Sequence, residues 1–76
     1  MPDSTNTLTK LIASTRSAYR ALERGEDTTT VYAALEVAYA AEGLDANVAE
    51  SSVDWYEMGV SLLTESLTDA LDRATA

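Results

Sequence analysis

The chain has 76 residues, 46% of them hydrophobic, and it contains neither cysteine nor histidine. A chain this short, residues 1–76, forms one domain and buries only about 60% of the surface that it exposes when unfolded. Because no disulfide and no tetrahedral zinc site can form, its stability must come from helix packing or self-association. Its net charge of −8 repels nucleic-acid backbones and anionic membranes, so we expect it to bind neither.

The first predicted element is a helix over approximately residues 5–24. Thr5 or Asn6 can cap its start, and Gly25 stands where a left-handed residue ends a helix. Residues 1–4 are expected to be disordered. One face of this helix carries residues at steps of three and four, the spacing of a buried helical face: Leu8, Leu11, Ile12, Thr15, Tyr19 and Leu22.

A second helix is predicted over approximately residues 28–42, which are rich in alanine. Alanine favours a helix and lets a neighbouring backbone come close. Asp27 or Thr28 can cap the start of this helix, and Gly43 ends it. Its buried stripe consists of Val31, Leu35 and Ala38.

The segment before the last helix, residues 44–51, has two interpretations. Asp45 can cap a short turn of helix over residues 46–50, or the segment can be a loop. The last helix is then predicted over approximately residues 52–74. Its apolar seam, typical of helix–helix packing, consists of Val53, Tyr56, Val60, Leu63, Leu67, Leu71 and Ala74. The sequence therefore predicts an all-α fold, a small three-helix bundle that a second copy could complete.

The predicted last helix carries two candidate surfaces. At 100° per residue, six carboxylates gather opposite the seam; this acidic stripe consists of Glu50, Asp54, Glu57, Glu65, Asp69 and Asp72. Between stripe and seam lies a second apolar strip, which consists of Trp55, Met58 and Leu62. An earlier helix can cover this strip, or a partner or second copy can bury it. Tryptophan is enriched among interface hot spots, and methionine at adaptable binding surfaces.

The charges are unevenly distributed along the chain. Residues 1–24 hold four bases and two acids, a net charge of +2, whereas residues 25–76 hold one base and eleven acids, a net charge of −10. The first helix can attract the later helices within the chain, or the acidic part can face a basic partner. Arg16, Arg20 and Arg24 follow each other at four-residue steps. We expect them to pair with acids of the later helices or with Glu23 and solvent; the alternative is a small anion-binding patch.

The sequence contains no recognisable catalytic constellation. Without histidine and cysteine, the usual general base and the strongest protein nucleophile are missing, and a Ser-His-Asp triad cannot form. The three glycines are isolated, so they form no phosphate-binding loop, and the segment that starts at Asp45 lacks most ligands of a calcium loop. We therefore expect no enzymatic activity, no cofactor and no metal. Neither an apolar run of ~18 residues nor a signal peptide is recognisable, so a cytoplasmic location is expected.

The segment from Ser52 to Met58 resembles the modification site of acyl carrier proteins. In that family a serine at the start of a helix carries phosphopantetheine and is followed by an apolar residue and later by a glutamate and another apolar residue. Ser52, Glu57 and Met58 match these positions, but Ser51 replaces the preceding aspartate and only 24 residues follow Ser52. The resemblance implies that Ser52 carries the group. The alternative is that Ser51 or Ser52 caps the last helix.

Two kinds of function remain. In the first, the protein is an interaction module or small regulator that buries the apolar strip against another protein or a second copy of itself. In the second, it mimics nucleic acid, as a viral inhibitor would, and its acidic stripe occupies a basic groove of a nuclease, repressor or defence complex. Carboxylates four residues apart lie about 6 Å apart along a helix, comparable to phosphates along a strand. The acidity has a further explanation, because one lysine, ten threonines and thirteen alanines are typical of an intracellular protein adapted to high salt.

Overall fold

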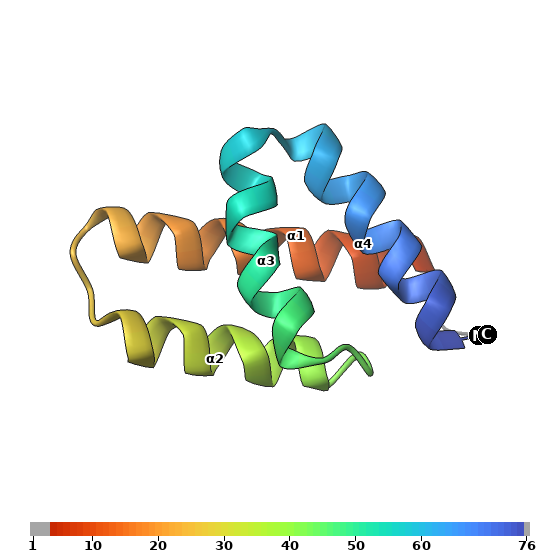
Figure 1. The fold of residues 1–76 in the computed structure, drawn as a ribbon, viewed down its shortest axis with the longest axis horizontal. Coiled ribbons are helices and arrows are strands. Elements are labelled where there is room, and N and C mark those ends of the chain that lie inside the picture. The colour runs from red at the N-terminus through yellow and green to blue at the C-terminus, as the bar shows by residue number, and fades with distance from the viewer. Residues whose placement is uncertain (1–3, 76) are drawn as a thin grey trace.

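The computed structural model describes residues 4–75, which form four helices and no strand (Figure 1). The helices are α1 (Ser4–Glu23), α2 (Thr28–Ala40), α3 (Ala46–Met58) and α4 (Val60–Thr75). Figure 1 shows α1 and α2 side by side as a hairpin, with α3 lying across both. α3 contacts each of the other three helices, and α4 contacts α1 and α3. The all-α prediction is confirmed, but the predicted number of three helices is wrong.

Local capping explains where the middle helices begin. The Asp27 carboxylate accepts a hydrogen bond from the Thr30 amide at 3.0 Å, so Asp27, and not Thr28, caps α2. The Asp45 carboxylate accepts from the Val48 amide at 3.1 Å and begins a full helix rather than a short turn or a loop. Each cap satisfies an amide that has no partner within its helix.

The ends of the first two helices follow the prediction closely. Gly25 and Gly43 adopt positive φ angles of 82° and 81°, the left-handed conformation that glycine adopts at helix ends. α1 begins at Ser4, so Thr5 and Asn6 lie within it and do not cap it. Of the N-terminal segment expected to be disordered, residues 1–3 lie outside the described residues.

The predicted last helix over residues 52–74 is wrong, because the chain breaks at Gly59 and α3 already begins at residue 46. Gly59 has a φ of 153°, a conformation that is open almost only to glycine. Its amide donates to the Trp55 carbonyl oxygen at 3.0 Å, and its own carbonyl oxygen accepts from the Leu63 amide at 3.1 Å. One residue thus ends α3 and begins α4, and the two helices form a second hairpin (Figure 1).

The core lies where α3 crosses the other helices. Its largest fully buried side chains are Tyr39, Leu11, Leu63 and Leu67. Leu63 and Leu67 come from the predicted apolar seam, and Val53 of the same seam is also buried. Val60 is 52% exposed, because the break at Gly59 turns it away from the packed side. Burial of the apolar side chains, at about 25 cal/mol per Å², is the main force that holds the four helices together.

Three polar side chains meet inside this core: Thr15 of α1, Tyr39 of α2 and Ser52 of α3 are each 0% exposed. The Thr15 hydroxyl donates to the Leu11 carbonyl oxygen at 2.8 Å, so the Tyr39 hydroxyl, 2.5 Å from it, donates to Thr15. The Ser52 hydroxyl donates to the Ala49 carbonyl oxygen at 2.6 Å and lies 3.4 Å from the Thr15 hydroxyl oxygen. Among the described residues, no buried side-chain polar atom lacks a partner, as a stable core requires.

Ser52 lies in the middle of α3, so the interpretation of Ser51 or Ser52 as a helix cap is wrong. The Ser52 hydroxyl is buried and hydrogen-bonded. In this fold it offers no surface for the attachment of phosphopantetheine, and the carrier-protein resemblance gains no support.

Substitution of Gly59 by alanine distinguishes the broken helix from a continuous one. We expect Gly59→Ala to lower the free energy of unfolding by about 1–3 kcal/mol, because alanine is strained at this φ. An added Cβ atom would meet nothing within 4 Å, so the loss measures backbone strain alone. In a continuous helix the same substitution would instead raise the free energy of unfolding by about 1 kcal/mol, because alanine favours a helix more than glycine does.

Urea unfolding followed by circular dichroism measures this difference. Ser61→Ala, an exposed change two residues away, is the matched control and should shift stability by no more than about 0.5 kcal/mol. A stabilised Gly59→Ala protein would contradict the break between α3 and α4.

The buried phenol of Tyr39 makes stability sensitive to alkaline pH. Burial raises the pKa of Tyr39 above its ordinary value of 10.0, although hydrogen bonds with Ser52 and Thr15 lower it in part. The folded state therefore favours the neutral phenol, and its contribution to stability is present below the pKa of the unfolded chain and lost as the pH rises above it. We expect Tyr39→Phe to lose about 1 kcal/mol at neutral pH but to lose less of the remaining stability than the wild type above pH 10.0.

Thr15→Val provides the control, because it removes the partner of Tyr39 and leaves the phenol in place. This variant should also be less stable at neutral pH, yet keep the alkaline decline of the wild type. Chemical unfolding at a series of pH values tests both variants, and parallel curves for wild type and Tyr39→Phe would contradict the assignment.

Candidate functional site

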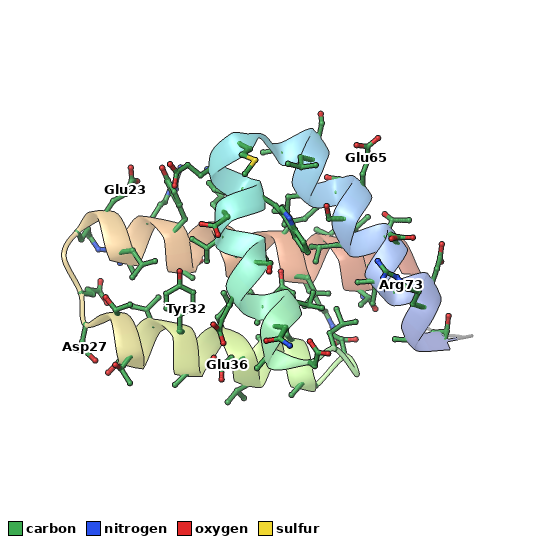
Figure 2. The ribbon with its side chains drawn as sticks, in the orientation of Figure 1. Glu23, Asp27, Tyr32, Glu36, Glu65 and Arg73 are labelled. Atoms are coloured by element: carbon green, nitrogen blue, oxygen red, sulfur yellow. The ribbon has the colours of Figure 1, made fainter. Side chains whose placement is uncertain are left out.

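The six carboxylates of the predicted acidic stripe are all exposed, but they do not form one line. Gly59 divides them into a group on α3, Glu50, Asp54 and Glu57, and a group on α4, Glu65, Asp69 and Asp72. In the view of Figure 2, Glu65 lies with Arg73 on α4, to the right of α3. Asp69 accepts a hydrogen bond from Arg73 at 2.5 Å. The α4 group is thus partly neutralised, whereas the α3 group is not.

The fold brings further acids to the α3 group. Glu36 of α2 and Glu50 of α3 line a groove of about 560 Å³ together with Tyr32. Figure 2 shows Tyr32 and Glu36 on α2, to the left of α3, and Glu23 near the end of α1. We define the acidic face as Glu23, Glu36, Glu50, Asp54 and Glu57.

Two tyrosines report the proximity of these acids. Burial raises the pKa of Tyr32, and the negative charges of Asp54 and Glu50 raise it further. Burial likewise raises the pKa of Tyr19, with added contributions from Glu23 and Glu57. A phenol becomes negative when it ionises, so nearby carboxylates oppose its ionisation. Carboxylates of the acidic face therefore lie near two partly buried tyrosine rings, those of Tyr32 and Tyr19.

A third tyrosine completes this surface. The rings of Tyr19 and Tyr56 lie with their centroids 5.1 Å apart at an angle of 54°, an ordinary geometry for a stabilising aromatic pair. The pair joins α1 to α3, and the charges of Glu23 and Glu57 raise the Tyr19 pKa. Helices from three parts of the chain thus hold the acidic face in a fixed arrangement.

None of the five acids on this face forms an ion pair with the side chains that the structure describes. The two ion pairs among those side chains are Arg24–Glu26, at 2.7 Å, and Arg73–Asp69. Both are exposed, and exposed pairs contribute little to stability. The acidic face therefore consists of like charges without compensation, which repel one another.

The structure divides the predicted apolar strip. Trp55 is partly buried and packs against the core, in a hollow between α3 and α4 that Leu44 and Ala70 also line. Met58 is 73% exposed and Leu62 37%. With Val60 these two residues form an apolar corner at the turn between α3 and α4. The chain itself partly covers Trp55, so within the predicted strip Met58 and Leu62, with Val60 beside them, are open to a partner.

Among the described side chains, one member of the row Arg16, Arg20 and Arg24 pairs with an acid. Arg24 bonds to Glu26 in the turn before α2, and no later helix supplies a partner among the described side chains. Arg16 and Arg20 are exposed and line a shallow groove of about 490 Å³ with Ile12. The expectation allowed pairing with acids of the later helices or with Glu23 and solvent. Pairing with a later helix is not found among the described side chains, whereas exposure of Arg16 and Arg20 to solvent is.

Two kinds of feature are absent from the described residues, a metal-binding group and a membrane-spanning helix. Across residues 4–75, no group of three acidic side chains is placed to hold a metal ion. Within the same range, no helix has both the length and the apolar character that crossing a bilayer requires. Comparisons with protein-family models, with curated proteins and with solved structures find no match. The candidate site therefore depends on the geometry of the acidic face and the apolar corner.

The acidic stripe predicted from the sequence contains three of the five acids on this face but not Glu23 and Glu36. The sequence predicts Tyr19 on a buried face and links neither Tyr19 nor Tyr32 to the acids. These residues come from α1 and α2, and no spacing along one helix connects them to α3. The one feature of the sequence that could have indicated this face is the excess of acidic over basic residues after residue 24.

The repulsion within the acidic face is measurable. We expect Glu50→Gln with Asp54→Asn to raise the free energy of unfolding by about 0.5 kcal/mol at low salt, because like charges four residues apart destabilise a helix. The gain should disappear near 1 M salt, where the screening length falls to about 3 Å.

Glu65→Gln with Asp69→Asn provides the control at the same spacing on α4. It removes the Asp69–Arg73 pair as well as a repulsion, so we expect no gain. Denaturant unfolding at low and high salt measures both variants. Equal stabilisation of the two, or a gain that persists in high salt, would contradict the clustering of unpaired acids around Tyr32.

Proposed function

We propose that this protein is a small helical interaction module that acts by contact and binds a positively charged protein through its acidic face. One observation carries the proposal: four carboxylates raise the pKa values of two tyrosines, a fifth, Glu36, lines the groove beside Tyr32, and none of the five is paired among the described side chains. Repulsion between these carboxylates lowers the stability of the fold. Binding of a basic partner would relieve that repulsion and so favour association.

The chemistry of the face suits arginine-rich surfaces. Carboxylates accept paired hydrogen bonds from a guanidinium group, and tyrosine rings offer faces on which the same group stacks. Glu50 and Asp54 lie one helical turn apart on α3, with Tyr32 beside them. Because helices hold these groups in place before binding, little conformational entropy is lost on association.

The apolar corner extends this surface. Asp54 and Met58 lie one turn apart on the exposed side of α3, and Val60 and Leu62 follow around the turn. A partner that places basic residues over the acids and one apolar side chain over Met58 would bury both surfaces together. Apolar anchors inside a polar rim are typical of protein interfaces. This geometry favours a basic amphipathic helix as the partner segment.

Nucleic-acid mimicry is a narrower form of the same proposal. The carboxylates on α3 span about two turns, with spacing near that of phosphates. The break at Gly59 shortens the line that the sequence predicted, and the acids of α2 and α1 widen it into a patch. Mimicry adds one requirement, namely that duplex DNA and this protein exclude each other from the same basic protein.

A fluorescent helical peptide tests the proposed function, with arginines one turn apart and one leucine anchor. We expect saturable binding at moderate salt, weakened about tenfold by Glu50→Lys with Asp54→Lys, a loss of roughly 1.4 kcal/mol. Met58→Ser should weaken binding without changing its salt dependence, since it removes only an apolar contact.

Glu65→Lys with Asp69→Lys makes the same change in net charge on α4 and is the matched control. It should leave binding nearly unchanged if the acidic face is the site. Equal losses in the two charge variants would show attraction to net charge alone and would contradict the proposal. Circular dichroism of each variant establishes that the helices are retained.

A further inference from the structure

We propose that the acidic face of one copy of this chain binds the arginine row of a second copy, so that molecules associate head to tail. We define the arginine row as Arg16 and Arg20 of α1 together with Arg24, which directly follows that helix. The inference rests on the proposed function, because it requires the acidic face to be a binding surface, and it names one partner for that face. It uses an independent observation as well, the exposed cations on the same molecule.

The two surfaces have opposite charge, and apart from Arg24 their charged groups form no ion pair among the described side chains of one molecule. Arg16 and Arg20 have no acidic partner among the described side chains, and Arg24 bonds only to Glu26 beside it. The five acids of the acidic face likewise have no cationic partner there. A second copy supplies to each surface the groups that its own chain does not.

The spacings of the two rows agree. Arg16 to Arg24 spans eight residues, about 12 Å along α1, at the helical rise of 1.5 Å per residue. Glu50 to Glu57 spans seven residues, about 10.5 Å along α3 by the same rise. Two helices lying side by side can therefore bring two or three opposite charges together at once.

The surface between the arginines permits close approach. Ala13 and Ser17 lie among them on α1, and both are small and exposed. With Ile12 they line the groove of about 490 Å³ beside Arg16 and Arg20. Small residues let the backbone of a second helix come near, so the long arginine side chains can reach carboxylates along its edges. The tyrosines beside the acidic face add rings on which guanidinium groups stack.

Net charge opposes the association only at low salt. Each copy carries −8, and the longest dimension of the molecule is 37 Å. At about 0.15 M salt the screening length is about 8 Å, so repulsion between whole molecules is weak while groups in contact still attract. At about 0.01 M salt the screening length is about 30 Å, and the net charges repel across most of the molecule. We therefore expect association to be strongest at intermediate salt.

Such a contact joins different surfaces of the two copies. Each added molecule leaves one acidic face and one arginine row free, so the assembly grows with concentration or closes as a ring. A basic partner would compete for the acidic face and release single molecules. Self-association and partner binding would then exclude each other.

Sedimentation velocity of the purified chain over a range of concentrations and salt tests the proposal. We expect the wild type to increase in mass with concentration at intermediate salt. Arg16→Glu with Arg20→Glu, and separately Glu50→Lys with Asp54→Lys, should each remain monomeric. An equal mixture of these two variants should associate again, because each keeps the surface that the other has lost and the reversed surfaces are complementary too.

Glu65→Lys with Asp69→Lys on α4 is the control for charge, and it should associate as the wild type does. A monomeric wild type at every salt concentration, or a mixture that stays monomeric, would overturn the inference. If the wild type is monomeric but the acidic face still binds the arginine peptide, only the self-association is wrong. If the peptide also fails to bind, the proposed function fails as well.

Discussion

The backbone of Gly59 sets the direction of α4 and with it the shape of the molecule. Its φ of 153° stops α3 and lets the chain turn, so that Leu63 and Leu67 of α4 pack into the core. The same turn lets α4 partly cover Trp55 and leaves Met58 and Val60 outside. It also divides the carboxylates between two helices. A straight helix here would have left the core open on one side, which so short a chain tolerates poorly.

The hydroxyl groups of Thr15, Tyr39 and Ser52 join α1, α2 and α3 at the centre of the fold. Apolar packing alone lets helices slide and rotate at small cost, whereas a buried polar group needs its partner at hydrogen-bond distance. The three hydroxyls therefore favour one register of the crossing helices. That register fixes which side of α3 faces solvent, and with it the position of Glu50, Asp54 and Glu57.

The surface separates charge instead of balancing it. Acids collect around Tyr19 and Tyr32, and arginines collect on the outer face of α1, with few ion pairs between opposite charges in the described part of the chain. Salt adaptation explains many acids, but it does not require them to gather around aromatic rings. Binding by contact explains both the gathering and the lack of compensation. The proposals for a basic partner and for a second copy both rest on the unpaired carboxylates of the acidic face.

Local features of the sequence determined the all-helical fold, the cap at Asp27, the glycine ends at Gly25 and Gly43, and the exposed side of the acids on α3. Each depends on periodicity or on contacts within about four residues, which a single sequence displays. The break at Gly59 could not be read in this way, because glycine is tolerated inside a helix at a cost of only about 1 kcal/mol. Burial of α4 against α1 and α3 outweighed that small local difference. The acidic face and the exposure of Arg16 and Arg20 were likewise decided by the tertiary structure, because only packing places Glu23 and Glu36 beside α3 and leaves these two arginines without an acid of a later helix among the described side chains.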